Sequence, residues 1–86
     1  MRIIPQKRFL KRLIKLSPKI RERVKIAVDL LEIDPFDTRL HNHPLNGTLA
    51  GLRSISVTTD VRIIFQEFFH YKIVLFLDIG THNQVY

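Results

Sequence analysis

The chain has 86 residues, enough for one small domain over residues 1–86 but not for a second hydrophobic core. It contains no cysteine, which excludes a disulfide framework and a zinc site built on thiolates. Its net charge is +6, and because no stretch approaches the ~18 consecutive apolar residues of a membrane span or the apolar run of a signal peptide, we expect a cytoplasmic protein without a membrane partner.

Two amphipathic helices are predicted near the start of the chain, after a short strand at 2–4. The stretch 6–16 has apolar residues every three or four positions, which is the pattern of a helix with one buried face. Ser17 and Pro18 then end this helix and begin a second one over 18–33, with Ser17 as N-cap and Pro18 in the first turn. Because the connection is so short, we expect an antiparallel helical hairpin.

The positive charge is concentrated in these two helices. Residues 1–33 hold ten Lys or Arg and three Asp or Glu, whereas residues 34–86 hold four and five. Lys7, Lys11 and Lys15 recur at a spacing of four and so line one face of the first helix. Such a face attracts phosphate-rich or acidic partners, although a solvated helix without a partner has the same pattern.

Three strands follow, at 52–58, 61–66 and 73–79. The first alternates apolar and small polar residues, and the last is a run of β-branched and aromatic residues that Gly80 ends. Short segments between the strands predict tight turns. The β-α-α-β-β-β order indicates the α+β class: a small curved, mainly antiparallel sheet, packed on one side by the N-terminal helical hairpin and open on the other.

A histidine and a tyrosine lie beyond the last strand. His82 can exchange a proton near neutral pH, because the unperturbed pKa of histidine is about 6.5, and Tyr86 can stack on a base or donate a hydrogen bond. A frayed tail is the alternative for this segment. His43 lies in a loop at the edge of the predicted sheet and Asp60 in a turn, where aspartate often has only local hydrogen bonds.

Arg53 and Arg62 interrupt strands that are otherwise apolar or small. A guanidinium in such a place must reach solvent, a carboxylate or a phosphate. Arg62 alternates with Ile63, so we expect it on the open face of the sheet. An ion pair with Asp60 or Asp78 is the structural alternative.

These residue types suit the cleavage of RNA. RNA carries its own nucleophile, since a 2′-hydroxyl can attack the adjacent phosphorus, so the protein need only orient it, transfer protons and neutralise the developing charge. His82, Arg62 and Tyr86 can supply those roles. Cysteine ligands and histidine or carboxylate pairs at metal-ligand spacing are missing, so we expect neither a metal nor a cofactor.

Five short motifs share a pattern that spans much of the chain. They are His43-Pro44-Leu45-x-Gly47, Gly51-Leu52-Arg53, Asp60, Arg62-Ile63-Ile64-Phe65 and Gly80-Thr81-His82-Asn83-Gln84-Val85-Tyr86. They resemble the RelE/ParE toxin superfamily, and most closely its YafQ-type members. The resemblance implies the toxin of a type II toxin-antitoxin system, a ribosome-dependent, metal-independent endoribonuclease (mRNA interferase) that cuts translated mRNA in the A site and is silenced by a cognate antitoxin.

The resemblance also assigns roles to individual residues. It implies that His82, Arg62, Tyr86, His43 and Asp60 are catalytic. We expect the substrate to be bound in addition by basic residues outside this group: Arg53, Lys7 and Lys11.

The chain departs from the YafQ-type pattern at two positions. Ser56 stands where those members carry a further catalytic histidine, and Val61 stands where an aromatic residue follows the turn aspartate. Serine cannot shuttle protons at neutral pH, so either Arg62 and His43 compensate or activity is reduced. A ParE-like toxin that inhibits DNA gyrase without catalysis shares the fold, and the missing histidine favours this alternative. A simple RNA-binding module is a third hypothesis.

Overall fold

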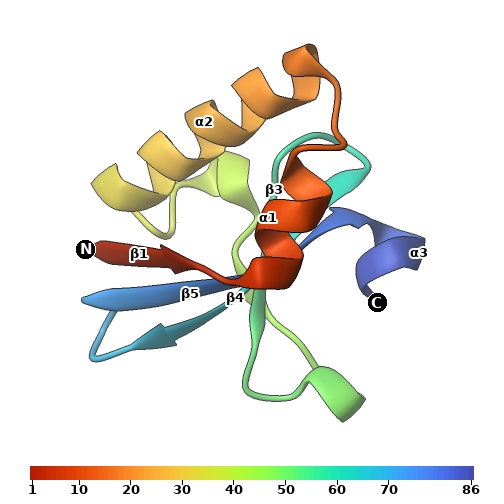
Figure 1. Ribbon diagram of the computed structural model, residues 1–86. Helices are drawn as coiled ribbons and strands as arrows, with labels where there is room; N and C mark the ends of the chain where they lie inside the picture. Colours follow the sequence, from red (N-terminus) through yellow and green to blue (C-terminus); the bar gives the residue numbers. More distant parts are fainter.

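The computed structural model describes residues 1–86, and its five strands form one sheet in the order β1-β5-β4-β3-β2 (Figure 1). The elements in chain order are β1 (Arg2–Pro5), α1 (Lys7–Leu13), α2 (Pro18–Ile33), the 3-10 turn η1 (Thr38–Leu40), β2 (His43–Pro44), the 3-10 turn η2 (Gly47–Leu49), β3 (Arg53–Ser56), β4 (Val61–Phe68), β5 (Ile73–Thr81) and α3 (His82–Val85). Only β1 and β5 run parallel, and every other neighbouring pair is antiparallel. The predicted α+β fold with a mainly antiparallel sheet is confirmed.

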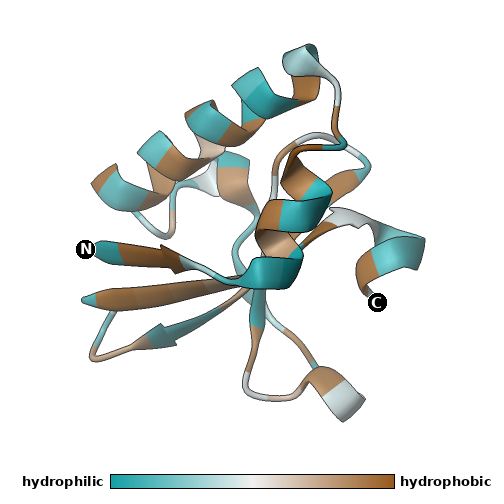
Figure 2. Ribbon diagram, viewed as in Figure 1, coloured by the Kyte–Doolittle hydropathy of each residue, from teal (hydrophilic) through white to brown (hydrophobic).

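The hydrophobic core lies between the sheet and the two N-terminal helices. Figure 2 shows that the apolar side of α2 is turned toward the sheet and its polar side outward. Phe9 of α1 packs on Phe76 of β5, with 5.1 Å between ring centroids, while Val24 and Leu31 bring α2 into the same cluster. Burying such aromatic and aliphatic side chains supplies most of the stability of so small a fold.

The start of α2 follows from the residues predicted to set it. The Ser17 hydroxyl accepts a hydrogen bond from the Ile20 amide at 3.2 Å, and Pro18 occupies the first helical position. The preceding helix is shorter than predicted and ends at Leu13. The segment that follows is a turn, whose carbonyls at Ile14 and Leu16 accept hydrogen bonds from the Arg21 guanidinium.

The end of the last strand differs from the prediction. Gly80 does not end β5, which continues to Thr81 and leads directly into the helical turn α3. A Cβ at Gly80 would lie 3.1 Å from the Gln84 Cβ and 3.3 Å from the Val85 Cγ1. Gly80 therefore permits α3 to fold back closely on the strand. The structure also adds β2, and none of its helices has the length and apolar character needed to cross a membrane.

Candidate active site on the open face of the sheet

Strand register brings several candidate residues to the face of the sheet opposite α1 and α2, which we call the open face. His43 of β2 pairs with Ser54 of β3, and Ser56 of β3 pairs with Arg62 of β4. Paired residues in neighbouring strands project to the same side, and these alternate with the core residue Ile55. The predicted position of Arg62 on the open face is therefore confirmed.

The helix α3 carries His82 and places it against Tyr86. A capping box begins this helix, in which the Thr81 amide donates to the Gln84 Oε1 at 2.8 Å. The rings of His82 and Tyr86 meet edge to face with centroids 4.4 Å apart. The Tyr86 hydroxyl and the fully buried Ser54 Oγ are 2.6 Å apart and share a hydrogen bond, so the segment is a helical turn anchored to β3 rather than a frayed tail.

A hollow of about 340 Å³ separates α3 from the loop that contains η2, and we call it the α3 cavity. Its lining is uncharged apart from the titratable groups of α3 itself: Leu45, Asn46, Gly47, Thr48, Leu49, His82 and Tyr86. Apolar and amide groups around a histidine and a tyrosine suit a flat, neutral group such as a nucleobase.

A second hollow of about 470 Å³ contains Ser56 and Arg62 of the open face, and we call it the cationic cavity. Arginine and histidine side chains dominate its lining: Arg39, His41, His43, Ser56, Val57, Thr58, Thr59 and Arg62. No carboxylate lines it. This composition favours an anion such as a phosphate.

The protonation pattern of His43 follows from its one hydrogen bond. The His43 Nδ1 lies 2.7 Å from the His41 carbonyl oxygen, which can only accept, so Nδ1 carries the hydrogen and donates. The other ring nitrogen, Nε2, has no protein partner in the structure. A neutral ring in this tautomer presents Nε2 as a proton acceptor on an exposed side chain.

Arg62 is half-buried and makes no ion pair. Its Nη1 donates to the Thr58 carbonyl at 2.8 Å, which orients the guanidinium along the wall of the cationic cavity. Asp78, one of the two acids considered as a partner, pairs with Arg8 and Arg12 instead. The Arg62 charge is thus directed by a backbone carbonyl and left available for an anion.

Four other predicted site residues lie outside the two cavities. Asp60 is exposed in the turn between β3 and β4, where its amide bonds the Thr58 hydroxyl at 3.3 Å. Lys7 and Lys11 are exposed on α1. Arg53 alternates with Ser54, so it projects to the opposite face from Arg62.

The Arg53 guanidinium has partners within the protein, so its presence in an apolar strand does not require a bound ligand. Its Nε donates to the Asn42 Oδ1 at 2.9 Å, and its guanidinium lies 5.6 Å from the centroid of the Phe36 ring. These contacts hold the segment after α2 against β3. They give the guanidinium partners within the protein, and a role for Arg53 in substrate binding stays a prediction.

The structure adds residues that the sequence did not point to. Arg39 enters the cationic cavity from η1, where Asp37 holds it through contacts of 3.0 Å to Nε and 2.8 Å to Nη2. The same hydrogen bonds lower the pKa of Asp37 from 3.8 to about 2. An arginine two residues after an aspartate is a local signal for such a pair, but its place beside His43 depends on tertiary structure.

Solved structures share this fold. YafQ from E. coli strain BL21(DE3) is 25% identical in sequence, with a TM-score of 0.79 over 100% of this chain and 99% of that one. A chain of the E. coli DinJ-YafQ complex is 26% identical, with a TM-score of 0.78 and the same coverage. A chain of the archaeal RelE-RelB complex from Pyrococcus horikoshii OT3 is 23% identical over 98% of this chain and 97% of that one, and its TM-score of 0.76 shows the same fold.

The fold is thus that of a small RelE-like toxin. The sequence profile described as "Bacterial toxin of type II toxin-antitoxin system, YafQ" matches residues 1–86, and the chain belongs to this family. Comparison with proteins of curated function gave no match.

Proposed function

We propose that this toxin is an endoribonuclease that cleaves mRNA on the translating ribosome through attack of the 2′-hydroxyl on the adjacent phosphorus. The observation that carries the proposal is the pair of cavities on one face of the sheet. One is cationic and contains Arg62 and His43, and the other is lined by His82 and Tyr86. An RNA chain needs such neighbouring places for its phosphate and its base.

The chemistry divides among a few side chains. Arg62 stabilises the negative charge that grows on the phosphorane, and its partial burial without an acidic partner strengthens that interaction. His82 transfers the proton as general acid or base, and His43 assists through its free Nε2. Tyr86 borders the α3 cavity and orients the base there.

The serine at position 56 decides which side chains can transfer protons in this site. It lines the cationic cavity opposite Arg62, at the position where YafQ-type members carry a histidine. A serine there cannot exchange a proton at neutral pH, so His43 and His82 must carry that work. Asp60 is exposed and lines neither cavity, so in this proposal it acts only on RNA that extends beyond them.

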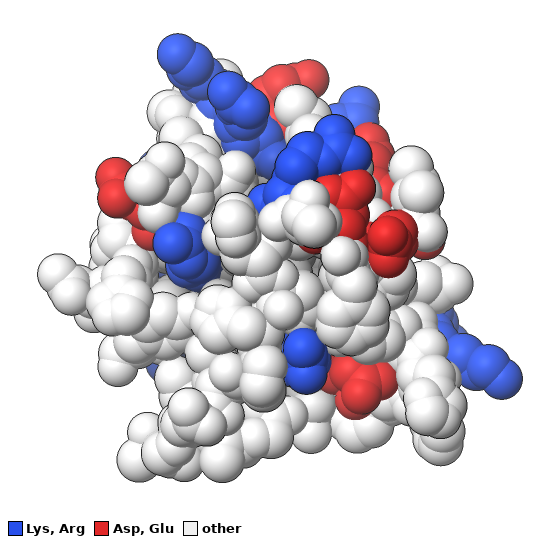
Figure 3. All heavy atoms as spheres, turned by 180° about the vertical axis from the view of Figure 1, so that it is seen from behind, with Lys and Arg blue, Asp and Glu red and all other residues white.

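Two partners follow from the same reasoning. The DinJ-YafQ and RelE-RelB complexes are toxin-antitoxin pairs by their names, and by similarity we propose that a cognate antitoxin binds this toxin. The exposed Lys7 and Lys11 give α1 a cationic surface that suits ribosomal RNA. Seen from behind, Figure 3 shows that lysine, arginine and acidic side chains gather mostly in the upper part of this face, whereas much of its lower part is uncharged.

The test is primer extension on mRNA in purified translating ribosomes. We expect the wild type to cut at A-site codons and His82→Ala to lose that cleavage. His70→Ala is the matched control, because His70 is also an exposed histidine but lines neither cavity. Intact mRNA with the wild type would overturn the nuclease proposal and favour the gyrase alternative, which a supercoiling assay then measures.

A further inference from the structure

The helix α3 is too short to be stable by itself. It has four residues, and in its backbone hydrogen bond the Tyr86 N–H donates to the His82 carbonyl at 3.0 Å. Helices of this length do not persist in water, and the carbonyls of the last turn lack partners within the helix. Contacts from elsewhere must therefore hold α3, together with the His82 ring that it carries.

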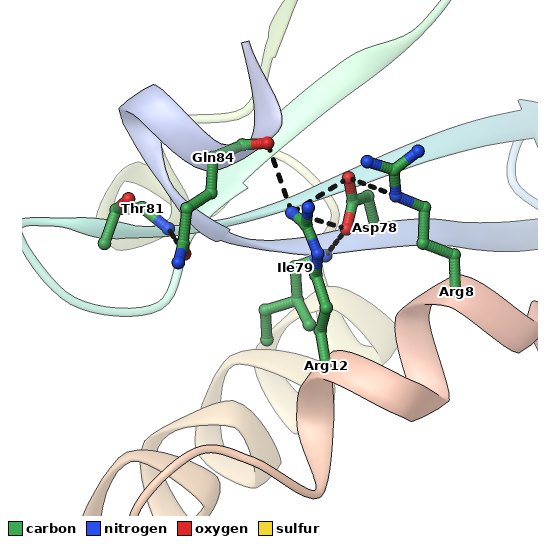
Figure 4. A network of polar contacts seen from close by, with 6 residues as sticks. All are labelled: Arg8, Arg12, Asp78, Ile79, Thr81 and Gln84. Atoms are coloured by element: carbon green, nitrogen blue, oxygen red, sulfur yellow. Dashed lines mark hydrogen bonds and ion pairs between the residues drawn. The ribbon is translucent and has the colours of Figure 1, made fainter.

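One such contact comes from α1, far away in the sequence. The Arg12 Nη1 donates to the Gln84 carbonyl at 3.1 Å, so a guanidinium caps the carbonyl end of α3 (Figure 4). A positive charge at this end also interacts favourably with the helix dipole. Arg12 thus provides a hydrogen-bond donor for a carbonyl that has no partner within the helix.

Asp78 of β5 holds Arg12 in place for this contact. The Arg12 Nη1 lies 3.2 Å from the Asp78 Oδ1 and 3.3 Å from its Oδ2. The Asp78 side chain is only 13% exposed, and its Oδ1 also accepts from the Ile79 amide at 2.9 Å. Because the carboxylate is fixed on the strand, Arg12 connects three elements: α1, β5 and α3.

Arg8 provides a natural comparison on the same helix. Its Nε pairs with the same Asp78 Oδ2 at 3.3 Å, but its side chain is 67% exposed and makes no hydrogen bond to α3. Arg8 and Arg12 are thus alike in charge and in acidic partner. They differ in the contact with Gln84 (Figure 4).

We propose that Arg12 is a positioning residue, which fixes α3 against the sheet and thereby holds His82 and Tyr86 at the open face. The effect on cleavage rests on the proposed function, whereas the effect on α3 does not. Misplacing a reacting group by about 1 Å can cost about a hundredfold in rate. A loosened α3 therefore lowers catalysis even though Arg12 touches no substrate.

The experiment compares Arg12→Ala with Arg8→Ala, since each variant removes one positive charge from α1 and one arm of the Asp78 pair. The first readout is hydrogen exchange of the Tyr86 amide, followed by NMR. The second is single-turnover mRNA cleavage over a range of ribosome concentrations, which separates the saturated rate from the half-saturating concentration. Thermal unfolding of both variants verifies that they are folded.

We expect Tyr86 exchange to accelerate about tenfold or more in Arg12→Ala and to stay within about twofold of the wild type in Arg8→Ala. We also expect a saturated cleavage rate about tenfold or more lower in Arg12→Ala alone, with the half-saturating concentration unchanged.

Equal exchange in the two variants would overturn the proposal, and so would faster exchange with an unchanged saturated rate. If the wild type does not cut mRNA, the proposed function fails, while the exchange rates still decide whether Arg12 fixes α3.

Discussion

The hydrogen bond between Tyr86 and Ser54 should be measurable as stability, because its acceptor has no access to water. Tyr86→Phe keeps the ring that packs against His82 and removes only the hydroxyl that bonds the Ser54 Oγ at 2.6 Å. Ser54 is 0% exposed, so its hydroxyl loses a partner that water cannot replace. We expect the free energy of unfolding to fall by about 1–3 kcal/mol.

Removing the other hydroxyl, that of Ser54, should lower the free energy of unfolding by less. Ser54→Ala removes the buried hydroxyl and leaves only the Tyr86 hydroxyl without its partner, on a residue that is 41% exposed. The expected loss is about 0.5–1.5 kcal/mol, the usual net value of one hydrogen bond. In the double variant no buried hydroxyl is left unpaired, so its total loss should be smaller than the sum of the single losses by about 1 kcal/mol.

Urea denaturation of the four proteins, followed by circular dichroism, measures these differences. An equivalent thermal series should show a lower midpoint by about 4–8 °C for each kcal/mol in a domain of this size. If the two single losses add to within about 0.3 kcal/mol, the hydroxyls do not interact in solution. In that case this hydrogen bond does not anchor α3 to β3.

Three further predictions concern charge, close packing and pH. Arg62→Ala should lower the saturated cleavage rate about a hundredfold and affect ribosome binding only slightly, and equal losses in the two measurements would refute its role in the transition state. Gly80→Ala should lower the free energy of unfolding by about 1–3 kcal/mol, because its Cβ would lie 3.1 Å from the Gln84 Cβ, and an unchanged denaturation midpoint would mean that α3 lies farther from β5. Arg39 lowers the pKa of Asp37 from 3.8 to about 2, so this carboxylate stabilises the fold above about pH 4 and loses that effect as the pH falls toward 2. The stability gap between the wild type and Asp37→Asn should therefore narrow from pH 5 to pH 2, and a constant gap would contradict the assignment.

Local signals were sufficient to predict most of the fold. Ser17 and Pro18 marked the start of α2 because an N-cap and a first-turn proline act within one turn of helix. The position of Arg62 on the open face followed from alternation along a strand, which depends only on neighbouring residues. Both features depend only on residues that are close together in the sequence.

The site was harder to predict because it depends on contacts between distant residues. Arg53 and Arg62 both interrupt apolar strands, and their different contacts come from distant segments: Arg53 bonds Asn42 and lies over Phe36, whereas Arg62 lines the cationic cavity with residues of η1 and β2. The helix α3 gives no periodic signal in four residues, and it depends on Arg12, Gly80 and Ser54 for its contacts. Arg39 enters the cationic cavity from a turn that precedes the predicted strands.

The parallel pairing of β1 with β5 has a consequence for biosynthesis. The first strand has no neighbour in the sheet except β5, and α1 packs through Phe9 on Phe76 of that same strand. A ribosome that makes this chain releases the N-terminal segments long before their partner emerges, so loop closure across most of the sequence must wait for β5. Because α3 directly follows β5, the placement of His82 also waits for this last strand to join the sheet.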